Sequence, residues 1–235
     1  MKEFGPQVSR ISERLAKVIR QKPNHAFGQV SRISEKLAKV IRQKPNHAFG
    51  KEGHGFSCRK PLKMSDVEKF ETQYAVALPT GYRTFITQVA NGGLGPAYGM
   101  FSLDDALRCR LTCSPLDEFP TDILKVAFQH TSPYNPDQDN AVIAMFDRAE
   151  TGDITEAEID RYQLYLTSGT LTLCHEGCGY LHRLVVSGPT RGQMWLDGEC
   201  SEQGYYPLGV SFLEWYENWL DDVIAGGPGT WWFDV

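Results

Sequence analysis

We expect the fold to be organised around residues 177–197, GCGYLHRLVVSGPTRGQMWLD. From Tyr180 to Ser187, apolar or aromatic side chains fall on both alternating faces, which is typical of a strand covered on both sides of a sheet. A turn signal follows at Gly188 to Gly192, and the strand pattern resumes from Gln193 to Leu196. The sequence therefore predicts a central hairpin whose return strand places Trp195 in the core.

Two glycines bracket Cys178 where the first strand of this hairpin begins. Glycine at such a position indicates a bulge or a close backbone approach, so we expect Cys178 to be held there for packing. The preceding Thr170 to Leu173 leads into the hairpin.

Composition places the chain among ordinary globular proteins. Its 235 residues suffice for one substantial core and a small N-terminal element, and the mean hydropathy is -0.36. Apolar runs stay well short of the roughly 20 residues that span a bilayer. Six cysteines without a continuous apolar leader favour reduced thiols, so we expect a cytoplasmic protein without membrane partners.

The net charge of -5 conceals a strong asymmetry. Residues 1–63 hold fifteen Lys and Arg against four Asp and Glu, whereas residues 64–235 hold nine against twenty-five. An acidic body of this kind attracts basic partners and repels nucleic acid, so we expect no direct nucleic-acid binding by the main domain.

A 22-residue tandem repeat fills most of the basic segment. Residues 7–28 and 29–50 are identical except for Arg14 against Lys36. In both copies the apolar residues recur with helical spacing, at Val8, Ile11, Leu15, Val18 and Ile19, then at Val30, Ile33, Leu37, Val40 and Ile41. We expect Pro23 and Pro45 to end these helices. Two copies are too few for a solenoid, so we expect one to dock and the other to be redundant or paired with it.

Basic amphipathic helices can bind nucleic acid or an anionic membrane, but they more often pack the apolar stripe and leave the charges in water. The segment can also lie against its own acidic body. We favour packing, with a domain division into the repeat at 1–50, a linker at 51–63 and a main domain at 64–235.

Local signals outline the main domain. Capping boxes are indicated at Ser65–Glu68, Thr155–Glu158 and Ser211–Glu214, each at the start of a predicted helix. Strands are predicted at Tyr98 to Leu103 and Ala141 to Phe146. The last predicted helix has a wide apolar stripe, formed by Phe212, Trp215, Tyr216, Trp219, Leu220 and Val223.

Three motifs occur in an order typical of one family. They are LPTGYRTFITQVANGGLGPAYGMFSL (78–103), the hairpin at 177–197, and SFLEWYENWLD (211–221). The matching features are the Leu78-Pro79…Tyr82 helix start, the Asn91-Gly92-Gly93 break, Gly177-Cys178-Gly179, Gly192…Trp195 and Phe212…Trp215. In these features residues 64–224 resemble the SUKH superfamily, the Smi/Knr-type domains related to a fungal cell-wall assembly regulator. The duplicated N-terminus and residues 104–169 depart from the family pattern.

The resemblance implies an α+β fold, a mainly antiparallel sheet with helices packed around it. It also implies a function, because bacterial SUKH domains are typically immunity proteins that bind a polymorphic or contact-delivered toxin and block its active site. We therefore expect a cytoplasmic toxin inhibitor of interbacterial competition, not an enzyme, without a cofactor. Its partner would be a cognate toxin domain, basic and acting on nucleic acid or nucleotides. The alternative is a regulatory scaffold or nucleic-acid-associated protein that acts through the basic N-terminal helices.

Acidic side chains beside the hairpin are the candidate toxin contacts. Residues 147–160 hold six acids against Arg148 alone, and such a run forms either a solvated face or a contact surface. Two tyrosines after the hairpin are candidate aromatic anchors. The full set is Asp147, Glu150, Asp153, Glu156, Glu158, Asp160, Asp197, Glu199, Glu202, Tyr205 and Tyr206.

The cysteines admit two further hypotheses. Residues 174–178, CHEGC, allow a zinc site together with Cys109 and Cys113, which would fit a zinc hydrolase, but a second well-formed pair is lacking. The second hypothesis is a nucleophilic Cys178 that uses His175 or His182 as its base. Buried thiols beside a sheet explain the same residues, so we expect no metal and no catalytic group. Residues 137–140 begin like a calcium loop but lack its glycine and closing glutamate.

Overall fold

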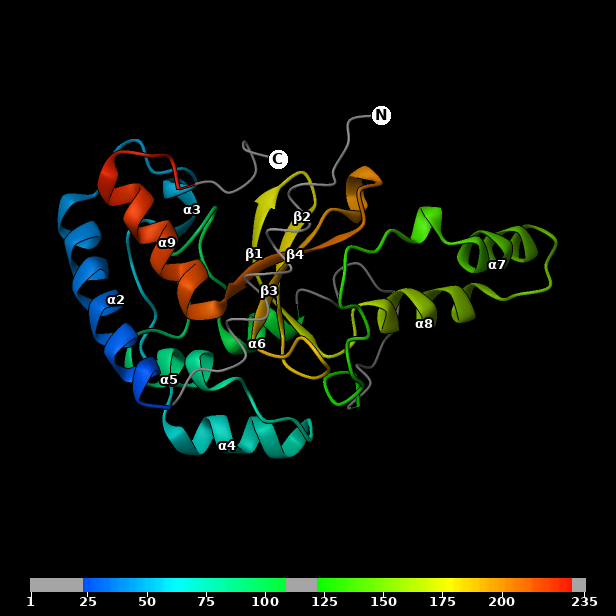
Figure 1. Cartoon of the computed structure of the whole chain (residues 1–235), viewed down its shortest axis with the longest axis horizontal. Coiled ribbons are helices and arrows are strands. Elements are labelled where there is room, and N and C mark those ends of the chain that lie inside the picture. Colours follow the sequence, from blue (N-terminus) through cyan, green and yellow to red (C-terminus); the bar gives the residue numbers. More distant parts are fainter. Residues whose placement is uncertain (1–22, 109–121, 230–235) are drawn as a thin grey trace.

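The computed structural model describes residues 23–108 and 122–229 as an α+β fold (Figure 1). A four-stranded antiparallel sheet runs in the order β1-β2-β3-β4, which confirms the predicted fold class. The elements in chain order are α2 (Pro23–Gln43), α3 (Lys51–His54), α4 (Met64–Gln73), α5 (Thr80–Gln88), α6 (Leu103–Arg108), the 3-10 turn η1 (Pro136–Gln138), α7 (Asn140–Glu150), α8 (Glu156–Leu166), β1 (Thr170–Gly177), β2 (Tyr180–Val185), β3 (Gln193–Asp197), the 3-10 turn η2 (Glu199–Ser201), β4 (Tyr205–Ser211) and α9 (Phe212–Ala225). None of the helices in these ranges is long and apolar enough to cross a bilayer.

The predicted hairpin is confirmed as β2 and β3. Strand β2 lies between β1 and β3, with Arg183 opposite Trp195 and Leu184 opposite Met194. Alternation sends Leu184 into the large core, whereas Val185 joins Trp195 in a smaller cluster on the other face. Trp195 is completely buried, as expected.

Helix α9 covers the face of the sheet that carries Leu184. Its capping box at Ser211 and Glu214 is formed, and all the predicted stripe residues are buried. The indole Nε1 of Trp215 donates to His182 Nδ1 over 2.9 Å, which fixes the helix directly to β2.

The second copy of the repeat forms most of α2, which packs along α9 (Figure 1). Its predicted apolar stripe enters the same core as α5 and α9. The helix ends at Gln43, just before Lys44 and Pro45, as predicted. Pro23 is the first residue of α2, where proline is tolerated because a residue in the first turn needs no backbone N–H donor. The helix predicted to end at Pro23 is not among the described residues. Residues 1–22 lie outside the described part of the chain.

Several predicted local structures are wrong. Ala141 to Phe146 is helical within α7, because Asp139 caps that helix by accepting from Ala141 N over 2.9 Å. An apolar run of six residues does not by itself distinguish a strand from a helix. Tyr98 to Leu103 makes a single bridge, Gly93 to Met100, before α6 begins.

Two predictions near residues 51–68 also need correction. The expected capping box at Ser65 and Glu68 is absent from α4, whose N-cap is Lys63, two residues before Ser65. The predicted linker at 51–63 contains the short helix α3, in which His54 is buried.

Cys178 lies in the turn between β1 and β2 and is exposed, so the expectation that it packs into the core is wrong. Both central residues of this turn, Cys178 and Gly179, have positive φ, 50° and 86°. That pattern belongs to the two-residue turn whose twist matches a hairpin. The predicted bulge does occur just before the turn, between His175 and Gly177.

We predict that Cys178→Asn raises the free energy of unfolding by about 0.5 kcal/mol, because asparagine tolerates positive φ better than cysteine. Urea unfolding followed by tryptophan fluorescence measures the change. The control Cys178→Val should lower stability, since a branched side chain is strained at this φ. A destabilising Cys178→Asn would contradict the assigned role of this turn.

Candidate partner-binding surface

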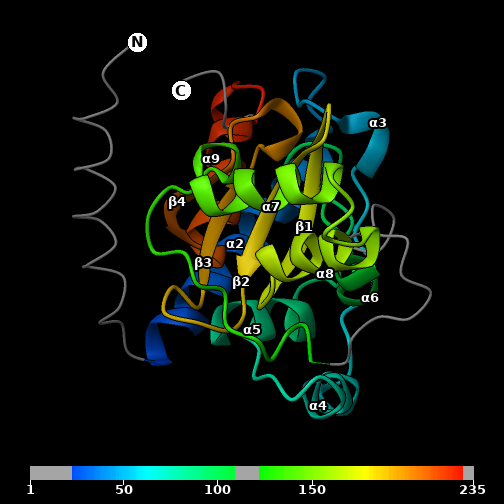
Figure 2. The same cartoon turned by 90° about the vertical axis from the view of Figure 1, so that its right-hand side faces the viewer.

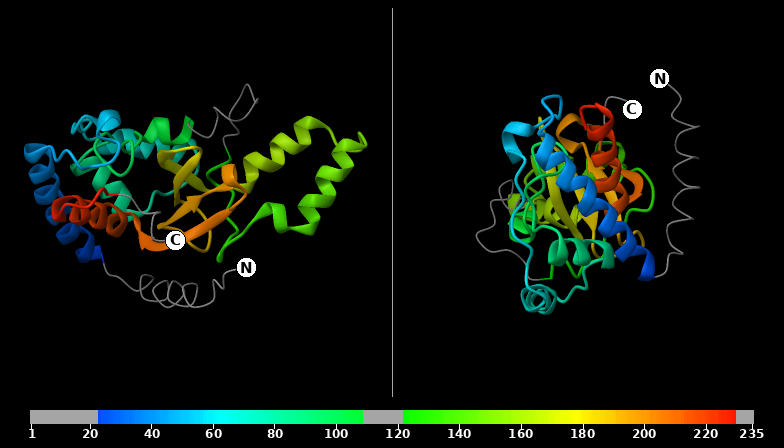
Figure 3. Two further views of the ribbon diagram at one scale, coloured as in Figure 1. Left: turned by 90° about the horizontal axis from the view of Figure 1, so that it is seen from above. Right: turned by 90° about the vertical axis from the view of Figure 1, so that its left-hand side faces the viewer.

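Helices α7 and α8 form a hairpin that projects from the sheet, and we call residues 137–166 the acidic arm (Figure 1). Seen from above, it extends away from the helices that cover the other face of the sheet (Figure 3). Asp139 caps α7, and the predicted capping box at Thr155 and Glu158 is formed at the start of α8. Both helices of the arm are therefore fixed by local hydrogen bonds.

Helix α7 exposes apolar side chains. Ile143 and Phe146 are 41% and 39% exposed, and only Val142 among its large apolar residues is fully buried. A helix with the sequence AVIAMF would normally face a core, and exposed apolar groups gathered on one projecting element are characteristic of partner interfaces.

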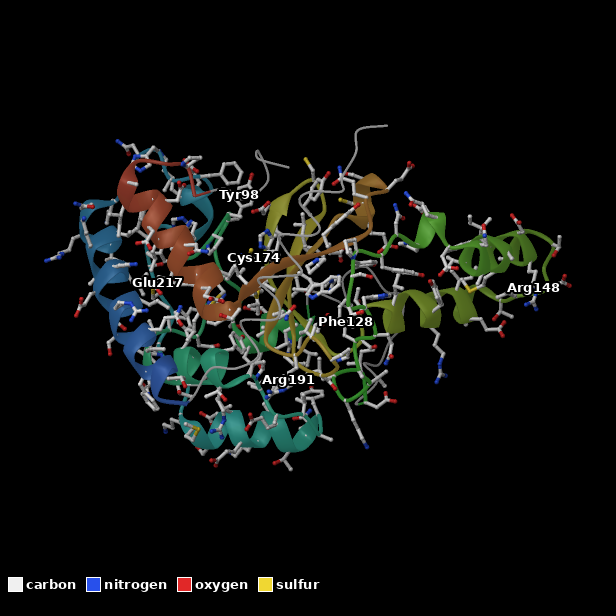
Figure 4. All side chains as sticks on the ribbon, viewed as in Figure 1. Tyr98, Phe128, Arg148, Cys174, Arg191 and Glu217 are labelled. Carbon is white, nitrogen blue, oxygen red and sulfur yellow. The ribbon has the colours of Figure 1, made fainter. Side chains whose placement is uncertain are left out.

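The candidate acids of residues 147–160 lie on the same arm as this apolar surface. Asp147, Asp153 and Glu158 are exposed. The backbone N–H of Thr155 holds the pKa of Glu158 below its ordinary value, so this carboxylate stays charged at neutral pH. Glu150, Glu156 and Asp160 lie on the same two helices, but their side chains fall outside the described part of the structure. Arg148 lies toward the tip of the arm (Figure 4).

Tyr134 anchors the base of the arm. Its backbone exchanges two hydrogen bonds with Tyr205 of β4, over 3.0 and 2.7 Å. Its hydroxyl donates to Asp139 Oδ2 over 3.0 Å and lies 3.4 Å from the hydroxyl of Tyr162 on α8. The ring stacks on His130 with centroids 4.2 Å apart. Burial, followed by these hydrogen bonds, raises the pKa of Tyr134 well above its ordinary value, so the phenol keeps its proton.

Two of the predicted contact residues are buried beneath the arm. Asp197 accepts from Arg183 Nε over 2.7 Å and Nη2 over 2.6 Å, while Arg183 Nη1 donates to Thr172. Tyr205 is 1% exposed and donates its hydroxyl hydrogen to Glu199. Asp197 and Tyr205 therefore hold the sheet together and do not belong to an exposed contact surface.

The remaining candidates lie beside the base of the arm. Glu199, Glu202 and Tyr206 are exposed. The amide of Asn135, which precedes η1, donates to the backbone carbonyl of Glu202 over 2.7 Å. This bond places the loop between β3 and β4 beside the base of the arm. Figure 2 shows the arm in front of the sheet.

The cysteines and histidines near the hairpin point in different directions. Cys174 is buried, Cys178 is exposed, and His175 stacks on Tyr98 with centroids 5.1 Å apart. His182 is buried, with Nε2 3.1 Å from Glu176 Oε1. Its other nitrogen faces Trp215, so His182 is not directed at the exposed thiol.

Within residues 23–108 and 122–229, His, Cys, Asp and Glu side chains form no group of three or more that could hold a metal ion. Cys109 and Cys113 lie outside these ranges, so the predicted ligand set is described only in part.

The sequence did not reveal the apolar surface of α7, because the run was assigned to a strand. Asp139 directly before that run was the signal that could have found the helix, since aspartate is a preferred N-cap. The contacts of Tyr134 with Tyr162 and Tyr205 join residues 28 and 71 positions apart, and no sequence motif marks them. The same holds for Arg183, whose partners Thr172 and Asp197 lie 11 and 14 positions away on neighbouring strands.

Comparison of the chain with protein-family models, with curated proteins and with solved structures finds no match.

We predict that Glu199→Gln makes stability less dependent on pH. Although Glu199 as a whole residue is exposed, its carboxyl group is partly buried where it accepts from Tyr205. This partial burial and the neighbouring Asp197 raise the pKa of Glu199 and outweigh the hydrogen bond from Tyr205. Because the folded state binds this proton more tightly than the unfolded state, stability falls as pH rises through the ordinary glutamate range to the higher folded pKa. Glutamine still accepts the bond from Tyr205 without the charge.

The measurement is the urea midpoint of both proteins between about pH 4 and pH 8. Glu202→Gln, which changes an exposed glutamate three residues further on, is the matched control. Equal pH slopes for Glu199→Gln and the unaltered protein would disprove the effect of burial on Glu199.

Proposed function

We propose that this protein is an immunity protein that binds a basic toxin domain through the acidic arm and blocks its active site. The carrying observation is the exposed apolar surface of α7, formed by Ile143 and Phe146, on an arm that also exposes the acidic residues Asp147, Asp153 and Glu158. Exposed apolar groups supply affinity once a partner covers them, and the charge around them selects a basic partner.

Electrostatics support fast association with such a partner. The arm that carries these acids projects away from the sheet (Figure 1), so an approaching basic surface can meet it before the rest of the protein. A field of one sign on a projecting element raises the association rate, and this effect weakens as salt increases. A domain that cleaves nucleic acid or nucleotides needs a basic cleft, which the acidic arm would occupy in competition with a phosphate-bearing substrate.

The resemblance to SUKH domains supplies the class of partner. The exposed surface suggests only a basic protein, whereas the family resemblance of residues 64–224 favours a toxin. A stoichiometric inhibitor requires neither a catalytic group nor a cofactor, which agrees with the role proposed for this surface.

A scaffold acting through the basic N-terminal repeat is the second candidate. One observation favours it, because Lys39, Arg42 and Lys44 remain exposed on and after α2. Arg32 and Lys36 on the same helix are instead paired with Glu217 of α9. Two basic residues of the second repeat copy are therefore neutralised by ion pairs within the protein.

Charge reversal tests the arm. We predict that the triple variant Asp147→Lys, Asp153→Lys and Glu158→Lys associates about tenfold more slowly at low salt with a toxin domain encoded by the adjacent reading frame. Stopped-flow fluorescence at two salt concentrations measures the rate. The matched control reverses Glu52, Asp66 and Glu68, which are exposed on α3 and α4, away from the arm. Equal rates for the two triple variants would remove the arm from the proposal.

Deletion of residues 1–22 tests whether the first copy of the basic repeat takes part in toxin binding. We predict that toxin binding survives this deletion, because the arm and α2 remain intact. Isothermal titration with the same toxin domain measures the dissociation constant. A loss of binding in a truncated protein with an unchanged circular dichroism spectrum would favour the basic repeat as the functional element.

A further inference from the structure

Helix α2 packs against α9 and α5 (Figure 3), and we call the surface of these two helices that receives it the α5–α9 groove. Four of its apolar side chains are buried there, namely Val30, Ile33, Leu37 and Val40. These residues belong to the core cluster that also contains Phe85 of α5 and Leu220 of α9. The groove therefore has the properties of a binding site for one amphipathic helix.

One glutamate of α9 recognises the polar edge of α2. Glu217, labelled in Figure 4, accepts from Gln29 Nε2 over 3.0 Å, Arg32 Nε over 3.1 Å and Lys36 Nζ over 3.0 Å. Lys36 also lies 2.6 Å from Asp221. Burial acts to raise the pKa of Glu217, but these donors outweigh it and the pKa is lowered. The groove therefore requires donors at three positions that share one helix face, i, i+3 and i+7.

The first copy of the repeat carries every one of these recognition groups. Gln7, Arg10 and Arg14 correspond to Gln29, Arg32 and Lys36. The apolar positions are identical, at Val8, Ile11, Leu15 and Val18. The single difference replaces lysine by arginine, which keeps the positive charge, so the groove has no chemical means of rejecting the first copy.

The chain can also make the required connection. The hexapeptide PNHAFG occurs twice, at residues 23–28 and 45–50. In the first position it forms the start of α2; in the second it turns, with Ala48 buried and Phe49 packed on Tyr98. Residues 23–28 can therefore adopt the conformation of 45–50, leaving residues 29–50 as a loop before Lys51. The entropy cost of closing a loop rises only slowly with its length.

We propose that residues 7–22 are a second, exchangeable ligand of the α5–α9 groove within the same chain. The second copy is favoured because it binds without a large loop, and the first replaces it whenever the second is removed or weakened. Tethering favours exchange within one chain over exchange between two chains. The protein can thus release either basic helix while its core stays covered, which holds regardless of the partner of the acidic arm.

Paired substitutions test the exchange. Leu15→Asp should leave the melting temperature unchanged, because the first copy is not the preferred ligand. Leu37→Asp should lower it by only a few degrees in the full chain, since the first copy takes over the groove. The same Leu37→Asp substitution after deletion of residues 1–22 should lower it at least twice as much or prevent folding, because a buried carboxylate then has no substitute. Deletion of 1–22 alone is the reference.

The proposal would be overturned if Leu37→Asp lowered the melting temperature equally with and without residues 1–22. It would also be overturned if Leu37→Asp left the melting temperature unchanged in both backgrounds.

A disulfide trap locates the occupant directly. In the Leu37→Asp background, Gln7→Cys combined with Glu217→Cys should give a disulfide between positions 7 and 217 under mild oxidation. Peptide mass mapping distinguishes this link from those of the native cysteines. The matched pair Gln29→Cys with Glu217→Cys should be the one that crosslinks when Leu37 is intact. Crosslinking of position 29 but never of position 7, in both backgrounds, would show that the first copy does not enter the groove.

Discussion

Strand β2 must be covered on both faces, and the rest of the fold supplies those two covers. Leu184 and Val185 of this strand point in opposite directions, and both are fully buried. Exposing either face of β2 to water would therefore cost free energy. Helix α9, itself supported by α2 and α5, covers one face. Phe128, Trp195, Tyr205 and the base of the acidic arm cover the other.

The two covers differ in their chemistry. On the α9 side, apolar burial dominates and Trp215 makes a single directed bond to His182. On the arm side, Arg183 is buried with Asp197 and Thr172, and a buried charge is stable only when it is paired. Asp197 also accepts a hydrogen bond from the backbone N–H of Glu199, whose carboxylate accepts from Tyr205. Tyr134, which is hydrogen-bonded to the backbone of Tyr205, connects this network to the arm. The exposed surface of α7 is thus positioned by the polar side of the sheet.

Sequence patterns predicted the fold better than the candidate site. The hairpin and the last helix with its cap were evident because each depends on residues close together in the chain. The docking of one repeat copy was expected from its local apolar stripe, although its partners on α9 lie far away in the chain. Asp197 and Tyr205 were assigned to the surface because alternation along a strand does not show which face another element will cover. The apolar run of α7 is short enough to fit either a strand or a helix. Its exposure depends on how the arm projects, which is a tertiary property.

The sequence by itself determined that the chain has a central hairpin, an acidic body and two copies of one basic amphipathic helix. Only the tertiary structure decided where the second copy lies and what its residues do. The hexapeptide PNHAFG makes the point most directly, because it is helical at residues 23–28 and a turn at residues 45–50. Its local preferences are the same in both places. The contacts of Ala48 and Phe49 with the body stabilise the turn, whereas residues 23–28 continue into the helix that fills the groove.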